Sequence, residues 1–317
     1  MPSKNASRSN SGLVKGWWLG PVIVYFCMLA AMLLFGILVS PFKISADILT
    51  VVEQWVVYAI PLIIIYLHVR RFERKKKFWQ SVGVRRKNLG QSLIWVFALF
   101  VVFTGITAIY WQTTTSTMGE DPRGSVDAYF EGENFEDLDN NGKHDPGEPF
   151  TDFNDNGERD SGFPDWYFGY VFFASFVPVA ISEELIFRGF TLDRFLAKGP
   201  IFAILASSIM FSSLHLWYIG FGISSLPLYG GVFLLAIWWG IVYWKTRNIV
   251  GLAIIHGLNN ASLSAGHFFG SSAVAAMSAT MFIIGIACLG FLLRGCVSGC
   301  LRRTKLWLGI LKHPNYQ

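Results

Sequence analysis

The apolar residues of the chain gather in long runs that are separated by short polar segments. Eight of these runs are long enough to cross a bilayer as a helix, which takes about 20 residues. They lie near residues 17–40, 48–68, 91–111, 166–197, 200–217, 226–244, 248–266 and 273–293. The pattern therefore predicts an all-α polytopic membrane protein with about eight transmembrane helices.

The composition agrees with a membrane protein rather than a soluble globule. Of the 317 residues, 53% are hydrophobic and only 15% are charged, and the mean hydropathy is +0.43. The four cysteines form no CxxC or Cys/His pattern, so neither a zinc cage nor a disulfide framework is indicated. The first apolar run has no small-residue cleavage site after it, which predicts a retained anchor rather than a signal peptide.

The loop charges predict the orientation in the membrane. Residues 70–87, between the second and third runs, carry nine Lys/Arg and one Glu. The positive-inside rule places this segment in the cytoplasm, and both termini follow it there. We therefore expect a multi-pass integral protein of a bacterial or archaeal plasma membrane, with cytoplasmic N- and C-termini. Residues 112–165 then lie on the outer side.

The net charge of +5 conceals a strong segregation. Residues 112–165 hold 15 of the 21 Asp/Glu and three of the 26 Lys/Arg, a net charge of −12, and the remaining chain carries +17. The basic excess fits the topology and membrane lipid as a partner, and it does not indicate nucleic-acid binding. The predicted regions are an N-terminal three-helix membrane region (1–111), an extracytoplasmic acidic insert (112–165), a catalytic membrane core (166–293) and a basic cytoplasmic tail (294–317).

The acidic insert contains an internal repeat of 15 residues. The aligned pairs are Asp137 with Asp152, Asp139 with Asn154, Asn141 with Asn156, and Asp145 with Asp160. The first copy matches the calcium-loop template D-x-[DN]-x-[DN]-G-x5-E over twelve positions. Its predicted ligands are the side-chain oxygens of Asp137, Asp139, Asn141, Asp145 and Glu148 and the backbone carbonyl of Lys143.

The flanking residues shape this calcium hypothesis. Pro149 directly follows the first loop and argues against an ordinary helix–loop–helix hand, so we expect helix-poor, EF-hand-like tandem loops between the third and fourth helices, with calcium in a structural role. The second copy has Phe163 where the bidentate Glu should stand. The alternatives are a solvated acidic linker rich in Asx turns and a calcium sensor, and the missing acid weakens the second of these.

Several ionisable and polar residues occur inside the apolar runs of the core, where such groups are costly. They are Glu183, Glu184 and Arg188 in SEELIFRG, His215 in FSSLH, and His256 and Asn260 in HGLNN. Glu184 stands four residues before Arg188, the favourable order for an ion pair on a helix. Glu183 lies about 100° further round the helix, so it is left to face a cavity.

A carboxylate and two imidazoles in a low-dielectric pocket can activate water by general-base catalysis, and Asn260 can donate to an oxyanion without carrying charge. Three alternatives stay open. A lone membrane His or Asn often only bonds to a neighbouring helix. A Glu and two His could hold zinc, as in a metalloprotease. Buried charges also serve as proton relays in transporters or stabilise non-catalytic scaffolds, although no inverted repeat is evident here.

The set of polar residues resembles the three signature motifs of a known family. The motifs are Glu183-Glu184-x-x-x-Arg188, Phe211-x-x-x-His215 and His256-x-x-x-Asn260. They resemble those of the CAAX protease and bacteriocin-processing family of intramembrane proteases, which includes the type II CAAX prenyl endopeptidase. The resemblance covers roughly 166–293. It implies an eight-helix α fold, a cavity open to membrane and cytosol, and peptide hydrolysis without a covalent acyl-enzyme.

The resemblance also implies roles for individual residues. Glu183 with His215 would position and activate the water, and His256 with Asn260 would form the oxyanion hole. Glu184 and Arg188 would support the site, and no catalytic metal is expected. The implied substrate is a peptide or protein, either a prenylated CaaX-like protein or another membrane-associated peptide. The acidic insert departs from the family pattern.

Overall fold

The computed structural model describes residues 19–42, 44–73, 77–85, 88–118, 132–141, 143–151, 157, 159, 163–216 and 226–311 of the chain. Within these ranges the secondary structure is helical, apart from one isolated antiparallel bridge between Phe135 and Phe150. The prediction of an all-α protein is therefore confirmed.

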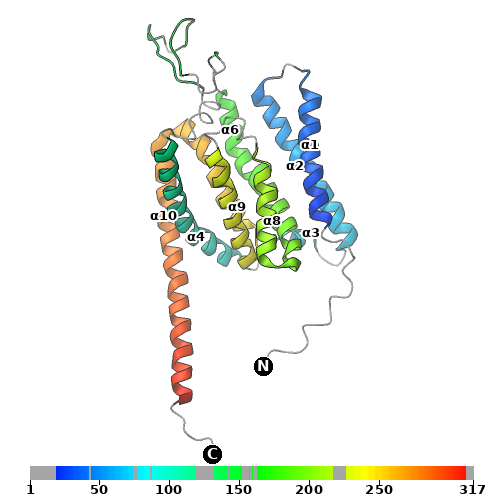
Figure 1. The fold of residues 1–317 in the computed structure, drawn as a ribbon, viewed down its shortest axis with the longest axis vertical. Coiled ribbons are helices and arrows are strands. Elements are labelled where there is room, and N and C mark those ends of the chain that lie inside the picture. Colours follow the sequence, from blue (N-terminus) through cyan, green and yellow to red (C-terminus); the bar gives the residue numbers. More distant parts are fainter. Residues whose placement is uncertain are drawn as a thin grey trace, which may run out of the picture.

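The helical elements follow one another along the chain as Figure 1 shows. They are α1 (Leu19–Val39), α2 (Ala46–Phe72), α3 (Phe78–Ser81), α4 (Leu89–Met118), α6 (Asp165–Ala174), η1 (Ser175–Ile181), η2 (Glu184–Leu192), α7 (Asp193–Phe195), η3 (Leu196–Lys198), α8 (Pro200–Ser213), α9 (Leu226–Thr246) and α10 (Val250–Leu311).

The long helices form one bundle. α1 and α2 pack together at one edge, α8 packs against α9 in the middle, and α4 packs against α10 at the other edge (Figure 1). α10 also contacts α6 and η1, while α2 contacts η1 and η2. The segment from α6 to η2 thus contacts helices from both ends of the chain, and η2 is its fully buried part.

Six described segments are long and apolar enough to cross a membrane. They are Leu19–Val39, Ile48–Phe72, Leu89–Ile106, Asp165–Lys198, Leu228–Thr246 and Ala275–Arg294. α8 is apolar but shorter. The protein is thus a multi-pass membrane protein, while the count of eight crossings and the orientation of the termini stay predictions.

The last two apolar runs meet at a glycine. α10 contains both of them, but Gly270 within it has φ 76° and ψ 172°, which is not helical. Positive φ is readily adopted only by glycine, so this residue permits the change of chain direction between the two helical segments (Figure 1). The runs predicted at 248–266 and 273–293 therefore correspond to two segments on either side of one glycine.

The fourth run is not the regular α-helix that the spacing argument assumed. Between α6 and α7 the chain forms two π-helical stretches, η1 and η2. Pro178 lies inside η1 and has no N–H to donate, which interferes with regular α-helical hydrogen bonding. π-helical turns are rare and often occur at functional sites. The motif SEELIFRG lies mostly on η2, and every residue of η2 is buried.

A glycine allows η2 to approach the loop after α3. A Cβ atom added at Gly189 would lie 2.1 Å from the backbone carbonyl oxygen of Val82, so the backbone itself blocks a larger residue. We expect Gly189→Ala to lower the free energy of unfolding by about 3 kcal/mol, because overpacking here must displace backbone. Thermal unfolding of the purified protein in detergent measures the effect.

Gly169 in α6 is the matched control for this substitution. A Cβ atom there meets nothing within 4 Å. Gly169→Ala is therefore expected to change the free energy of unfolding by no more than about 1 kcal/mol, the difference in helix propensity. Equal melting temperatures for the two alanine variants would contradict the close packing at Gly189.

Candidate active site

Two helical segments bring the predicted carboxylates and one predicted histidine together. Glu183 directly precedes η2, Glu184 is its first residue, and His256 lies on α10. Nδ1 of His256 is 3.0 Å from Oε1 of Glu184, and its Nε2 is 3.5 Å from Oε2 of Glu183. All three side chains are buried. The imidazole therefore lies between the two acids, each ring nitrogen facing one carboxylate.

The ion pair that the spacing predicted is present. Nη1 of Arg188 donates to Oε1 of Glu184 at 3.1 Å, and neither side chain is more than 1% exposed. The guanidinium carbon also lies 4.4 Å above the centre of the Phe211 ring. A buried charge of this kind needs a counter-charge, which Glu184 supplies.

Glu184 has a second role that the sequence interpretation did not include. Its Oε1 contacts both Arg188 and Nδ1 of His256. A partner on one ring nitrogen orients the other, so Glu184 directs Nε2 of His256 toward Glu183. Glu184 thus connects the supporting ion pair to the predicted oxyanion-hole residue.

His215 reaches the site from the turn after α8, not from within a helix as expected. α8 ends at Ser213, and the backbone N–H of His215 donates to the carbonyl of Ser212 at 2.9 Å. Nδ1 of His215 is 3.2 Å from the carbonyl oxygen of Phe211. Its imidazole interacts electrostatically with Glu183 and is half-buried. The predicted general-base pair therefore lies in one region of the fold.

Two aromatic side chains surround the imidazole of His256. The ring of Trp239 on α9 lies 4.2 Å from it between centroids, and the ring of Phe211 on α8 lies 6.2 Å away. Both aromatic residues are buried. Because apolar surroundings strengthen electrostatic interactions, the charges of the site act on one another more strongly than they would in water.

The structure does not join Asn260 to these groups by any contact among the described residues. Asn260 lies one turn beyond His256 on α10 and is half-buried, and its Oδ1 accepts from Nδ2 of Asn259 at 3.5 Å. Asn259 in turn lines an apolar pocket together with Trp239 and Ile255. The place of Asn260 in an oxyanion hole stays a prediction.

Residues 165–262 match the model of a protein family described as type II CAAX prenyl endopeptidase Rce1-like. We call residues 165–262 the Rce1-like segment. The Rce1-like segment runs from the start of α6 into α10 and contains every residue of the three motifs. The recognition made from those motifs is therefore confirmed, over a shorter range than the expected 166–293. No curated protein and no solved structure matches the chain.

The Rce1-like match supports a coarse functional class. The family description names an endopeptidase, so the segment is related to peptide hydrolases. Together with the apolar helices, this supports a protease of the membrane rather than a soluble enzyme. The individual roles of Glu183, His215, His256 and Asn260 stay predictions.

One contact of Glu183 comes from outside the Rce1-like segment. The hydroxyl of Tyr58, on α2, donates to Oε1 of Glu183. The sequence analysis did not identify this residue, which is one of several polar residues in the apolar run 48–68. Tyrosine is common in membrane helices at their ends, so the contact could be found only from the tertiary structure.

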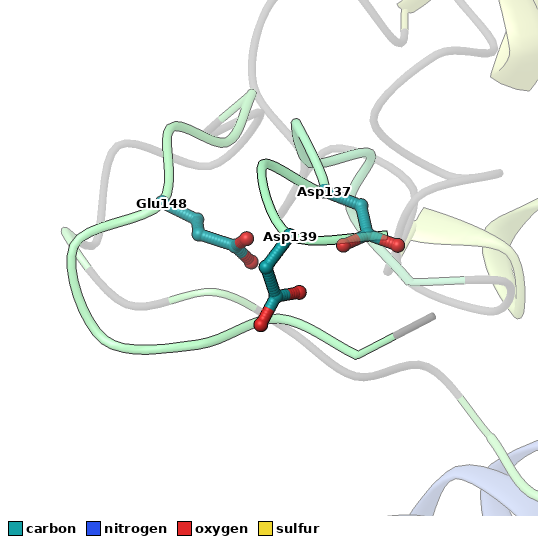
Figure 2. Close-up of side chains that lie close together, drawn as sticks. All are labelled: Asp137, Asp139 and Glu148. Atoms are coloured by element: carbon teal, nitrogen blue, oxygen red, sulfur yellow. The ribbon is translucent and has the colours of Figure 1, made fainter. Parts of the chain in front are cut away.

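The first predicted calcium loop lies before the Rce1-like segment and brings three acids together. Oxygen atoms of Asp137, Asp139 and Glu148 lie within 4.8 Å of one another (Figure 2). Both oxygens of Glu148 accept backbone N–H groups, from Leu138 and from Asp145, each at 2.8 Å. The acid at position twelve thus closes the loop against its own beginning.

The other predicted ligands of this loop are linked by hydrogen bonds. The backbone N–H of Asn141 lies 3.1 Å from Oδ1 of both Asp137 and Asp139, and its Nδ2 donates to Oδ2 of Asp145 at 2.6 Å. Oδ1 of Asn141 accepts from the backbone N–H of Lys143 at 2.7 Å. The side-chain oxygens needed for a hard cation are therefore present and close together.

No helix flanks this loop within the described part of the insert, which agrees with the helix-poor prediction. The backbone N–H of Glu136 donates to the carbonyl of Pro149, and that of Thr151 to the carbonyl of Asn134, each at 2.9 Å. These bonds and the bridge between Phe135 and Phe150 bring the two ends of the loop together. Four ligands predicted for the second loop lie outside the described residues: Asp152, Asn154, Asn156 and Asp160.

Proposed function

We propose that the protein is an intramembrane endopeptidase that hydrolyses a peptide bond with an activated water molecule. The observation that carries the proposal is the position of Glu183. Its carboxylate is buried in the candidate span Asp165–Lys198, and Oε2 lies 3.5 Å from Nε2 of His256. A buried carboxylate beside an imidazole, within an Rce1-like segment, is the arrangement that general-base catalysis needs.

In the proposed reaction Glu183, with His215, takes a proton from water while the water oxygen attacks the peptide carbonyl carbon. The carbonyl oxygen becomes an oxyanion, which accepts hydrogen bonds from His256 and Asn260. Collapse of the tetrahedral intermediate breaks the C–N bond, and the proton held by Glu183 passes to the leaving amine. The products are a carboxylic acid and an amine, and no covalent acyl-enzyme forms.

The proposed substrate is a peptide that is itself associated with the membrane, such as the lipidated C-terminus of a protein. The site lies among helices that can span a bilayer, so a substrate must reach it from the membrane or its surface. The family description of a prenyl endopeptidase supports a lipidated CaaX-like peptide in particular.

The test is cleavage of a library of farnesylated and unmodified peptides by the purified protein in detergent, with calcium present throughout. We expect the wild type to cleave some of these peptides and the Glu183→Gln variant to cleave none. No cleavage by the wild type across a wide library would instead favour a transporter or a non-catalytic scaffold.

A zinc metalloprotease is the second candidate mechanism, and geometry argues against it. Among the described residues, Asp137, Asp139 and Glu148 of the insert form the group whose ligand atoms lie close enough together to share a metal ion. The described acids and histidines around Glu183 do not form such a group. Arg188 also occupies Oε1 of Glu184. We expect a zinc-selective chelator, with calcium in excess, to leave cleavage unchanged. Loss of cleavage that added zinc restores would establish the metalloprotease.

We further propose that the first loop of the insert binds calcium in a structural role, with a dissociation constant on the order of 10⁻⁴ to 10⁻³ M, typical of extracellular sites. The convergence of Asp137, Asp139 and Glu148 supports this proposal. Glu148→Gln is expected to weaken binding about tenfold or more, because a bidentate charged ligand is lost. Isothermal titration of the full chain with calcium chloride measures the affinity.

Glu136→Gln is the control for this titration. Glu136 is exposed, lies in the same segment and does not belong to the acid group. Its replacement removes the same charge from the insert but no predicted ligand, so the affinity should stay within about twofold of the wild type. Equal weakening by both substitutions, or no calcium binding at all, would identify the insert as a solvated acidic linker.

A further inference from the structure

Glu183 receives a hydrogen bond that none of the three motifs supplies. Tyr58 on α2 donates its hydroxyl to Oε1 of Glu183, across the interface of α2 with η1 and η2. We propose that Tyr58 is a positioning residue of the active site, which holds the carboxylate of Glu183 in its working orientation. This inference rests on the proposed function of Glu183 as the general base.

The two oxygens of Glu183 have different surroundings because of this bond. Oε1 accepts from Tyr58, whereas Oε2 is 3.5 Å from Nε2 of His256 and has no hydrogen-bond partner among the described residues. The terminal torsion of a glutamate is broad and nearly two-fold, so without a partner either oxygen could face the imidazole. Tyr58 therefore leaves Oε2 as the oxygen available to water and substrate.

Tyr58 also opposes an unproductive contact. Glu183 interacts electrostatically with Arg188, whose own ion pair is formed with Glu184. Without the bond to Tyr58, this attraction between opposite charges would favour movement of the Glu183 carboxylate toward the guanidinium. A neutral hydroxyl donor fixes the carboxylate without neutralising its charge, which a base must keep.

The position of Tyr58 is set by bonds on either side of it along α2. About one turn before it, Oε1 of Gln54 accepts from the hydroxyl of Tyr170 on α6 at 3.1 Å. After the end of α2, Glu73 forms an ion pair with Arg194 on α7. α2 thus contacts the Rce1-like segment through polar side chains both before and after Tyr58 in the sequence. A helix outside that segment therefore contributes a side chain, Tyr58, to the site.

The test is the kinetics of Tyr58→Phe on any peptide that the wild type cleaves, with Tyr170→Phe as the matched control. Both variants lose one hydroxyl between α2 and the Rce1-like segment, but only Tyr58 contacts Glu183. We expect Tyr58→Phe to lower kcat about tenfold to a hundredfold, the range for a hydrogen bond to a charged group, with KM within about twofold. Tyr170→Phe should keep both constants within about twofold of the wild type.

Melting temperatures of both variants accompany the kinetics, so that activity is compared at a temperature where both are folded. A similar loss of activity in Tyr58→Phe and Tyr170→Phe would assign the effect to helix packing and overturn the inference. Wild-type kinetics for Tyr58→Phe, with Glu183→Gln inactive, would overturn the inference alone and leave the protease standing. Wild-type cleavage by Glu183→Gln would overturn both.

Discussion

Replacement of Glu183 by glutamine is expected to lower kcat for peptide cleavage by about a thousandfold or more. The amide cannot take a proton from water, so the general-base step and the later proton transfer to the amine are both lost. Glutamine has nearly the same shape and keeps an oxygen to accept from Tyr58. Melting temperature and elution volume in detergent should therefore stay close to those of the wild type, and single-turnover cleavage measures the loss.

Glu53→Gln provides the control for charge removal within the membrane region. Glu53 lies on α2 and is half-buried; it interacts electrostatically with Tyr58 but is neither a motif residue nor a member of the pairs formed by Glu183, Glu184 and His256. Its replacement should leave kcat within about twofold of the wild type. If Glu183→Gln cleaved as fast as Glu53→Gln, the base would have to be another residue and the proposed mechanism would be wrong.

Replacement of the adjacent Glu184 by glutamine is expected to act mainly on stability. Arg188 is 1% exposed and would keep its charge without its counter-charge, and His256 would lose the carboxylate at Nδ1. Breaking a buried ion pair in this way costs about 3–5 kcal/mol of unfolding free energy. Thermal or denaturant unfolding in detergent measures the loss. Activity per folded molecule should fall less than in Glu183→Gln, because Glu184 orients His256 but does not take the proton.

Asp193→Asn is the comparison for this stability experiment. Asp193 pairs with Arg247, whose side chain is 40% exposed, at 2.8 Å. Partly exposed pairs contribute at most about 1 kcal/mol, so this variant should unfold close to the wild type. Full activity with equal melting temperatures for Glu183→Gln and Glu184→Gln would refute the separate roles given to the two acids.

Sequence reasoning was most successful where the physical cause is local. Backbone groups in a bilayer must bond within their own segment, so a long apolar run implies a helix, and the helices follow the predicted runs. The ion pair of Glu184 with Arg188 also depends on spacing alone. It survives in η2 although the backbone there is π-helical instead of α-helical.

Some features lay beyond local reasoning even within the recognised segment. The choice between α- and π-helical bonding in η1 and η2 depends on packing against surrounding helices as well as on Pro178. α8 ends before His215, so this histidine lies on a turn even though the apolar run of the sequence continues past it. A hydropathy pattern indicates which residues are buried. It does not indicate which backbone carbonyl accepts the hydrogen bond of each backbone N–H.

By itself, the sequence determined that the protein is a helical membrane protein, which ionisable residues lie inside its apolar runs, and that residues 165–262 match the Rce1-like family. Only the tertiary structure decided that Glu184 serves both Arg188 and His256, that Trp239 covers the imidazole, and that Tyr58 donates to Glu183. The reason is that spacing along a helix determines which side chains share a face. Contacts between helices depend on how the whole bundle packs.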